Sequence, residues 1–233
     1  MKQIIAADKM FTGTDWLLNH ALVLNNDTIE SIQPIVSLKE TATQQVPILI
    51  PALIDLQIYG AGGQLLSVYP TVEALQLLKD YCVNGGAAWF QPTVATNSNE
   101  VIYACIDAVR AFKQLPNNRC IGLHVEGPWI NPIKRGAHLS EFIYQPTANQ
   151  VKDLLEYGKG IITMITLAPE ICDKEMVDLI QSYGVVVSAG HSNADYATAT
   201  KAFNEGISTA THLYNAMSAL QHREPGMVGA IFN

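Results

Sequence analysis

Three residues that can bind a metal ion each follow a short apolar run in this chain. Glu126 ends the run IGLHVE, His191 ends VSAGH, and His212 ends ATH. One carboxylate and two imidazoles form a known ligand set for catalytic zinc, with a further position left for water. Any one of these histidines alone could instead be a hydrogen-bonded residue at the mouth of a loop. Three such residues in matching positions favour a metal site.

Other side chains able to take part in chemistry lie in the stretches that contain Glu126 and His212. The stretch GLHVEGPWINPIKRGAHL contains His138, a ring donor, and the stretch HLYNAMSALQHREPG contains Asn215 and Arg223. A chain with excess negative charge that handles an anion needs a local cation, and the forked guanidinium of arginine suits phosphate. The alternative is that Arg223 and Glu224 form a surface ion pair of little consequence. Position in the sequence does not decide between the two.

Gln57 and Tyr59 are informative about the number of metal ions. They lie in the stretch IDLQIYGAGG, where many metal-dependent barrel hydrolases carry His-x-His to hold a second ion. Neither side chain supplies that pair, so we expect one metal ion and not two. The glycines that follow lack both the spacing and the lysine of a phosphate-binding P-loop, which argues against nucleotide binding.

Buried parallel strands are the elements that must position these residues. Six apolar runs have the character of strands: 48–58, 87–94, 120–125, 161–167, 185–189 and 208–211. Most of them alternate with helical patterns. One helix is predicted over 71–84 and ends at Gly85-Gly86, and another begins after Asn193 as its N-cap and ends at Gly206. Apolar strands separated by helices are typical of parallel sheets covered on both faces.

Two parallel architectures are compatible with this pattern, an open doubly wound sheet and a (β/α)8 barrel. Polar residues follow the ends of many different strands, and a barrel gathers all of these ends around one mouth. An open sheet would concentrate its site at one switch point, and no glycine-rich phosphate fingerprint follows the first strand. We therefore predict an α/β fold of the (β/α)8 TIM-barrel type, incomplete here at about six β-α units.

The first part of the chain has a different pattern of predicted elements. Short β-favouring runs at 2–7, 16–24 and 28–34 are separated by turn-forming residues. We predict residues 1–46 to be the N-terminal part of a small β domain. Residues 47–233 are predicted to form the barrel, truncated before its last two strands.

Composition excludes several classes of protein. The net charge is 14 − 21 = −7, which argues against nucleic acid or an anionic membrane as the main partner. Apolar residues make up 48% and charged residues 15%, which excludes disorder. No run approaches the roughly 20 apolar residues of a membrane helix, and the start lacks the core of a signal peptide. Four widely spaced cysteines suggest buried thiols in a reducing compartment, so we expect a cytoplasmic protein.

Six stretches of the chain, in order, resemble the N-acetylglucosamine-6-phosphate deacetylase family of the amidohydrolase superfamily. They are IDLQIYGAGG, QPTVATNS, GLHVEGPW, ITLAPE, VSAGHSNADY, and THLYNAM followed by REPGMVGAI. The resemblance runs from about residue 50 to the last residue, and the combination is highly specific. It implies a metal-dependent hydrolase that acts on a non-peptide amide bond. The reaction would convert N-acetyl-D-glucosamine 6-phosphate to D-glucosamine 6-phosphate and acetate in amino-sugar catabolism, on a barrel joined to a small β-sandwich.

The resemblance places the metal ligands on the residues identified above, Glu126, His191 and His212. They would hold one divalent ion per subunit. Zn²⁺ is the expected ion, and Fe²⁺, Co²⁺ or Mn²⁺ could also occupy such a site.

The resemblance also implies which residues meet the substrate, a small sugar phosphate. Six residues would contact it: Gln57 beside the metal, Ala137 and His138 at the sugar, Asn215 and Ala216 near the phosphate, and Arg223 on the phosphate itself. His138 would also act in catalysis by helping to steady the oxyanion. The family further suggests a homodimer, with His138 and Arg223 at or near its interface.

The resemblance implies that the family's general acid/base aspartate has no counterpart in this chain. Family members continue well over a hundred residues further, and that part carries a seventh-strand histidine and the eighth-strand aspartate. The 233 residues are therefore expected to turn over feebly on their own, and their unpaired barrel edges favour a dimer or a larger assembly. Two alternatives stay open: a catalytically impaired fragment that binds metal or sugar phosphate, and a deacetylase of N-acetylgalactosamine 6-phosphate.

Overall fold

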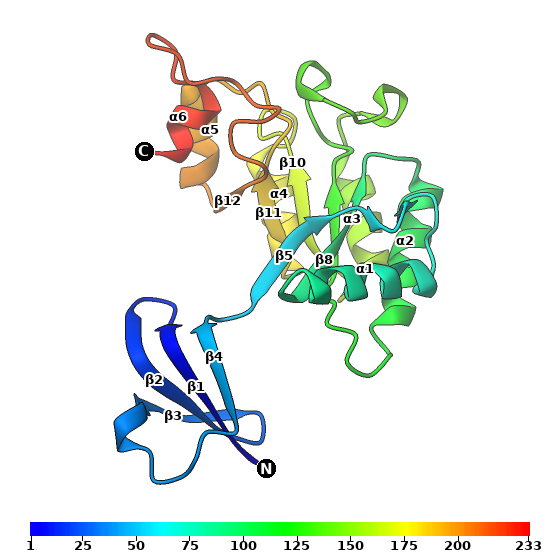
Figure 1. Ribbon diagram of the computed structural model, residues 1–233. Helices are drawn as coiled ribbons and strands as arrows, with labels where there is room; N and C mark the ends of the chain where they lie inside the picture. Colours follow the sequence, from blue (N-terminus) through cyan, green and yellow to red (C-terminus); the bar gives the residue numbers. More distant parts are fainter. The chain divides into compact units, whose positions relative to one another are not determined.

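The computed structural model describes residues 1–233, in two units that comprise Met1–Leu53 and Ile54–Asn233. The first unit contains a four-stranded sheet in the order β3-β2-β1-β4 (Figure 1). Its strands are β1 (Lys2–Phe11), β2 (Trp16–Asn25), β3 (Thr28–Pro34) and β4 (Gln44–Leu49), with a 3-10 turn, η1 (Ile35–Ser37), after β3. The predicted β layer is therefore present.

The apolar run expected as one strand over 48–58 is divided between the two sheets. Its first residues end β4, which pairs in parallel with β1, and its later residues form β5 (Leu53–Ile58). Pro51 lies between the two strands and has no N–H to donate to a ladder. Pro47 lies within β4, an edge strand, where a missing N–H is tolerated. The division of the chain at 1–46 and 47–233 stays a proposal.

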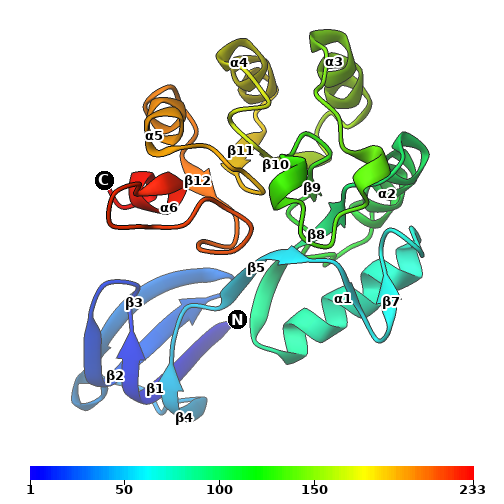
Figure 2. The same cartoon turned by 90° about the horizontal axis from the view of Figure 1, so that it is seen from above.

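The second unit is built on a six-stranded sheet in which spatial order follows chain order. The strands are β5, β8 (Ala87–Ala95), β9 (Leu123–Glu126), β10 (Ile162–Leu167), β11 (Val186–Ala189) and β12 (Thr209–Ala210). The pairs with a defined register, from β8 to β12, are all parallel. Seen from above, the strands form an arc with the helices along its outer side (Figure 2). An open doubly wound sheet would reverse its order at a switch point, so the prediction of an incomplete barrel with a separate small sheet is confirmed.

Six helices follow the strands, and the first five of them are capped by side chains at their starts. They are α1 (Val72–Asn84), α2 (Asn99–Phe112), α3 (Ala148–Tyr157), α4 (Lys174–Ser182), α5 (Tyr196–Asn204) and α6 (Gly226–Ile231). The predicted helix at 71–84 is present, with the Thr71 hydroxyl accepting from the N–H of Ala74. The predicted N-cap Asn193 is wrong, because Asp195 caps α5. The N–H of Asn193 instead donates to the carboxylate of Glu170.

One continuous core lies between the sheet of the second unit and its helices. Its largest fully buried side chains include Phe90, Phe112, Leu123 and Ile165. Smaller elements follow two of the strands. The hairpin of β6 (Gly60–Ala61) and β7 (Gln64–Leu65) follows β5, and the 3-10 turns η2 (Pro132–Lys134) and η3 (Ser140–Phe142) follow β9. None of the helices is long and apolar enough to cross a membrane.

Candidate metal centre and substrate site

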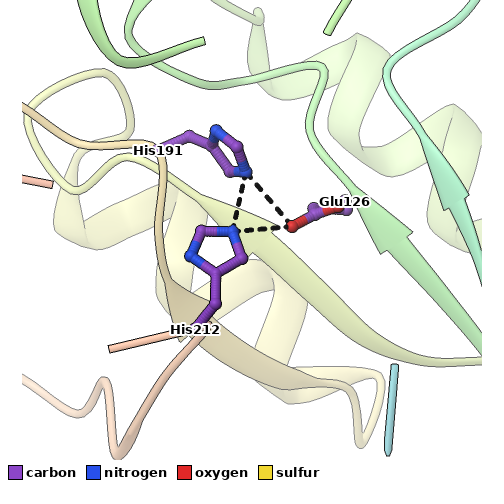
Figure 3. Close-up of side chains that lie close together, drawn as sticks. All are labelled: Glu126, His191 and His212. Carbon is purple, nitrogen blue, oxygen red and sulfur yellow. Dashed lines mark hydrogen bonds and ion pairs between the residues drawn. The ribbon is translucent and has the colours of Figure 1, made fainter. Parts of the chain in front are cut away.

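The three candidate ligands come together because their strands are parallel neighbours. Glu126 is the last residue of β9 and lies in register with Thr166 on β10. His191 comes two residues after β11, and His212 comes two residues after β12. The carboxyl ends of parallel strands share one edge of the sheet, so residues far apart in sequence meet there (Figure 3).

The ligand atoms of these residues are in mutual contact. Oε1 of Glu126 lies 3.2 Å from Nε2 of His191 and 3.2 Å from Nε2 of His212. The two Nε2 atoms are 2.9 Å apart. The Glu126 side chain is completely buried and that of His191 nearly so, whereas that of His212 is 24% exposed. The three atoms form a small cluster, and His212 is its most exposed member.

Backbone carbonyls determine which nitrogen of each ring faces the cluster. Nδ1 of His191 lies 2.9 Å from the carbonyl oxygen of Lys134, and Nδ1 of His212 lies 3.0 Å from that of Asn215. A carbonyl only accepts, so each Nδ1 carries a proton, and in the neutral ring each Nε2 presents a lone pair. Two lone pairs and a carboxylate oxygen at these distances repel one another unless a cation lies among them. The donor set and its orientation therefore fit a metal ion.

Gln57 and Tyr59 reach the carboxylate of Glu126 from the first barrel strand. Nε2 of Gln57 donates to Oε1 at 2.8 Å, and the Tyr59 hydroxyl donates to Oε2. Burial, reinforced by the negative charge of Glu126, raises the pKa of Tyr59, so the phenol stays protonated. These two residues lie where a His-x-His pair would hold a second ion, and they act here as hydrogen-bond donors to Glu126. The expectation of a single metal ion stays a prediction.

His138 also lies beside the carboxylate of Glu126. Its Nε2 is 3.5 Å from Oε2 of Glu126, and its ring packs on that of His191. The backbone N–H of Thr96 donates to Nδ1 at 3.3 Å, and the Thr96 hydroxyl lies 2.7 Å from the same atom. An amide N–H cannot accept, so Nδ1 is the acceptor and Nε2 carries the proton. His138 thus offers an N–H donor to the site.

The electrostatics of the cluster favour a charged carboxylate. Burial alone would raise the pKa of Glu126, but hydrogen bonds, among them those from His138 and Tyr59, hold it well below its usual range. When His212 is protonated, its Nε2–H bonds to Glu126 and raises the pKa of the ring, so a proton competes with a metal ion for this nitrogen. By contrast, burial lowers the pKa of His124 to about 4. That ring is neutral and its Nε2 lies 2.7 Å from the Thr166 hydroxyl, inside the barrel.

The remaining predicted substrate residues are less tightly placed. Ala137 precedes His138 and is exposed. Asn215 is exposed, and its N–H donates to the carbonyl of His212 at 2.8 Å. Ala216 is half-buried, and its carbonyl accepts from the N–H of Ser192.

Arg223 is exposed in the segment between β12 and α6. Among residues 1–233 no ion pair joins it to Glu224, whose Oε1 accepts instead from the N–H of Tyr196 at 3.1 Å. The structure thus brings Gln57 and His138 to the candidate ligand Glu126, whereas Arg223 forms no hydrogen bond or ion pair with the candidate ligands.

Sequence reasoning missed the donors that surround Glu126 and His138. The sequence indicates only that Tyr59 cannot supply a ligand for a second metal ion, and it does not predict the hydrogen bond to Glu126. Thr96 is not among the residues predicted above, although it directly follows β8 within the stretch QPTVATNS. Its position just past a strand end was a usable signal, because such positions line the mouth of a barrel.

Known proteins resemble this chain in sequence and in structure. Residues 8–45 match the family described as the NagA composite domain. The N-acetylglucosamine-6-phosphate deacetylase of Haemophilus influenzae is 34% identical and aligns with 100% of this chain and 62% of its own length. The N-acetylgalactosamine-6-phosphate deacetylase of a Shewanella species (strain ANA-3) is 40% identical and aligns with 79% of this chain and 46% of its own.

A solved structure matches over the same extent. The crystal structure of the N-acetylglucosamine-6-phosphate deacetylase from Pasteurella multocida superposes with a TM-score of 0.88 at 30% identity, covering 100% of this chain and 62% of that one. The chain therefore spans about three fifths of the length of the Haemophilus and Pasteurella relatives.

Proposed function

We propose that this chain, which belongs to the N-acetylglucosamine-6-phosphate deacetylase family of amidohydrolases, supplies the metal site and part of the substrate site of a deacetylase. The family consists of metal-dependent hydrolases. The proposed reaction is the hydrolysis of N-acetyl-D-glucosamine 6-phosphate to D-glucosamine 6-phosphate and acetate. We assign this reaction to a protein of the same length as its relatives. Such a protein would include the general acid/base aspartate that the resemblance implies.

The observation that supports this function most strongly is the convergence of unprotonated ligand atoms. Glu126, His191 and His212 direct one carboxylate oxygen and two Nε2 lone pairs at the same point. A divalent ion bound there would act as a Lewis acid, polarising the acetyl carbonyl and lowering the pKa of water. We assign the three residues as ligands of one such ion. Zn²⁺ suits two imidazoles and a carboxylate, and Fe²⁺, Co²⁺ and Mn²⁺ are the alternatives to be tested.

His138 is proposed to donate a hydrogen bond to the acetyl carbonyl oxygen of the substrate. Thr96 fixes the ring so that the Nε2 proton points into the cluster. A donor held in place before the reaction stabilises developing negative charge without reorganising. Gln57 and Tyr59 donate to the two carboxylate oxygens of Glu126 and so keep this side chain oriented toward His191 and His212.

The phosphate end of the substrate is assigned to the segment after β12. Arg223 offers a forked donor, and Asn215 and Ala216 offer side-chain and backbone groups near His212. Ala137, beside His138, is assigned to the sugar. A sugar phosphate bound with its acetamide at the metal would then extend from the strand ends toward Arg223.

The galactosamine epimer is a second candidate substrate. The Shewanella relative named for N-acetylgalactosamine 6-phosphate is 40% identical to this chain, above the 34% of the Haemophilus relative. Acetate release from both epimers by the Zn²⁺-loaded protein separates the candidates. Faster release from the glucosamine derivative supports the first proposal, and faster release from the galactosamine derivative supports the second. A metal-loaded protein of the relatives' full length that deacetylates neither substrate would contradict the function.

We further propose a homodimer located in the cytoplasm. All four cysteines are free and buried, which suits a reducing compartment. Light scattering of the purified protein tests the dimer, and a stable monomer at micromolar concentration would contradict it.

A further inference from the structure

Glu170 gathers hydrogen-bond donors from two loops that carry parts of the proposed site. It lies three residues after β10. Its Oε1 accepts from Nδ2 of Asn131 at 2.9 Å and from the N–H of Asn193 at 2.7 Å. Its Oε2 accepts from the Ser192 hydroxyl at 2.6 Å. Asn131 belongs to the loop after β9, whereas Ser192 and Asn193 directly follow the candidate ligand His191.

The backbone of His191 has a conformation that must be held by its surroundings. Its φ is +47°, in the left-handed region that residues with a Cβ rarely adopt. The N–H of Asn131 donates to the His191 carbonyl at 2.9 Å. On the far side, the N–H of Ser192 donates to Ala216, and the Ser192 carbonyl accepts from Ser218. Glu170 adds hydrogen bonds to Ser192 and Asn193, which directly follow His191.

The same carboxylate also stabilises the loop that orients the His191 ring. Asn131 begins the turn whose Lys134 carbonyl accepts from Nδ1 of His191. Glu170 therefore links two segments. One is the loop after β9, whose Lys134 carbonyl orients the His191 ring, and the other is Ser192-Asn193, which continues the His191 backbone. Displacing either would move Nε2 of His191 away from the point it shares with Glu126 and His212.

A carboxylate suits this position because all three of its partners donate. The Asn193 N–H cannot reverse its role. The Ser192 hydroxyl already accepts from the N–H of Ala194 at 3.0 Å, so its own proton is directed to Glu170. A glutamine in place of Glu170 would turn its NH₂ group toward at least one donor and lose that hydrogen bond.

We propose that Glu170 is a positioning residue of the metal site, holding His191 in its ligating geometry through Ser192, Asn193 and the Asn131 loop. This inference rests on the proposed metal site. Groups of this kind around a metal ligand, when removed, weaken metal affinity by about 10- to 100-fold.

Binding of Co²⁺ to the full-length protein tests the proposal. We expect Glu170→Gln to weaken Co²⁺ affinity, measured by competition with a chelator, by about 10- to 100-fold and to alter the visible spectrum of the bound ion. The control Glu175→Gln makes the same chemical change at an exposed position in the first turn of α4 and should bind within about twofold of the parent. A merely structural role would lower the melting temperature of the metal-free variant and leave affinity and spectrum unchanged, which would overturn the proposal.

A second variant keeps the test informative if Glu170→Gln fails to fold. Ser192→Ala removes one donor and retains the carboxylate, so we expect a smaller loss of Co²⁺ affinity, about threefold to tenfold. If both variants fold, the losses in the double variant should be less than additive, because the two side chains share a hydrogen bond. Unchanged affinity in Ser192→Ala, or fully additive losses, would overturn the proposal. If the parent itself binds no Co²⁺, the metal site fails and this inference fails with it, which distinguishes that result from a failure of Glu170 alone.

Discussion

The metal cluster (Glu126, His191 and His212) and the segment 213–225 differ in how the fold holds their side chains. In the cluster, each ring has a backbone carbonyl on Nδ1, and both oxygens of the carboxylate accept hydrogen bonds. In the segment, residues 216–218 are tied to Ser192, but Arg223 is exposed and has no ion pair. Sheet register thus determines the metal end of the proposed site, whereas its phosphate end relies on a loop.

This contrast predicts that the two ends respond differently to substitution. Changes in the cluster should remove metal and activity together, because its groups share one small space. Changes in the segment should weaken substrate binding and leave the metal in place. Function carried on loops supported by a rigid scaffold is a common division in enzymes.

The largest effect is expected from loss of a ligand. His191→Ala leaves two of the three proposed protein ligands, so we expect metal content to fall from about one equivalent per chain to near zero, with loss of activity. Elemental analysis after dialysis measures this content. His20→Ala, in the first unit, is the control. A His191→Ala protein that retained a full equivalent of metal would contradict the assignment.

His138 should be the next most sensitive position and should separate catalysis from metal binding. Removing a donor to a developing oxyanion costs about 10²- to 10³-fold in kcat, so His138→Ala should lose that much while keeping its metal. Thr96→Val removes the hydroxyl but retains the backbone N–H that fixes the ring, and its loss should be less than about tenfold. Steady-state kinetics on N-acetyl-D-glucosamine 6-phosphate provide the measurement. Equal losses in the two variants would argue against the role of the ring.

Substitution of Arg223 tests the proposed phosphate end of the site, in the segment 213–225. A hydrogen bond to a charged group contributes about 1.5–3 kcal/mol, so Arg223→Ala should lower kcat/KM for the phosphorylated substrate by roughly 10- to 100-fold. Metal content should not change, and activity toward unphosphorylated N-acetylglucosamine should be equal in parent and variant. A variant that lost activity equally toward both substrates would show that Arg223 does not act on the phosphate.

Removal of metal should shift stability by a smaller amount. An ion at 100 times its dissociation constant stabilises the folded state by about 2.7 kcal/mol, which corresponds to roughly 5–10 °C in melting temperature for a chain of this size. A chelator should therefore lower the melting temperature of the parent and leave that of Glu126→Ala unchanged. Calorimetry with and without chelator measures the difference. The same shift in both proteins would place the stabilising ion elsewhere.

The sequence predicted the parts of the molecule that depend on strand ends. The spacing of apolar runs indicated parallel strands, and polar residues just past them indicated a barrel mouth, so Glu126, His191 and His212 could be grouped in advance. The donors to Glu126 could not, because Gln57 and Tyr59 reach it from 69 and 67 residues away, across the sheet. Helix boundaries depend on such distant contacts as well. Asn193 looked like an N-cap, yet its N–H is directed to Glu170 and the helix begins after Asp195.

X-ray absorption at the zinc edge of the Zn²⁺-loaded protein tests the metal cluster most directly. We expect nitrogen and oxygen neighbours only, with the multiple-scattering signature of two imidazole rings and Zn–N distances of about 2.0–2.1 Å. That signature should fall to one ring or vanish in His212→Ala. A zinc ion bound by sulfur, or one that shows no imidazole in the parent protein, would contradict the assignment of Glu126, His191 and His212 as its ligands.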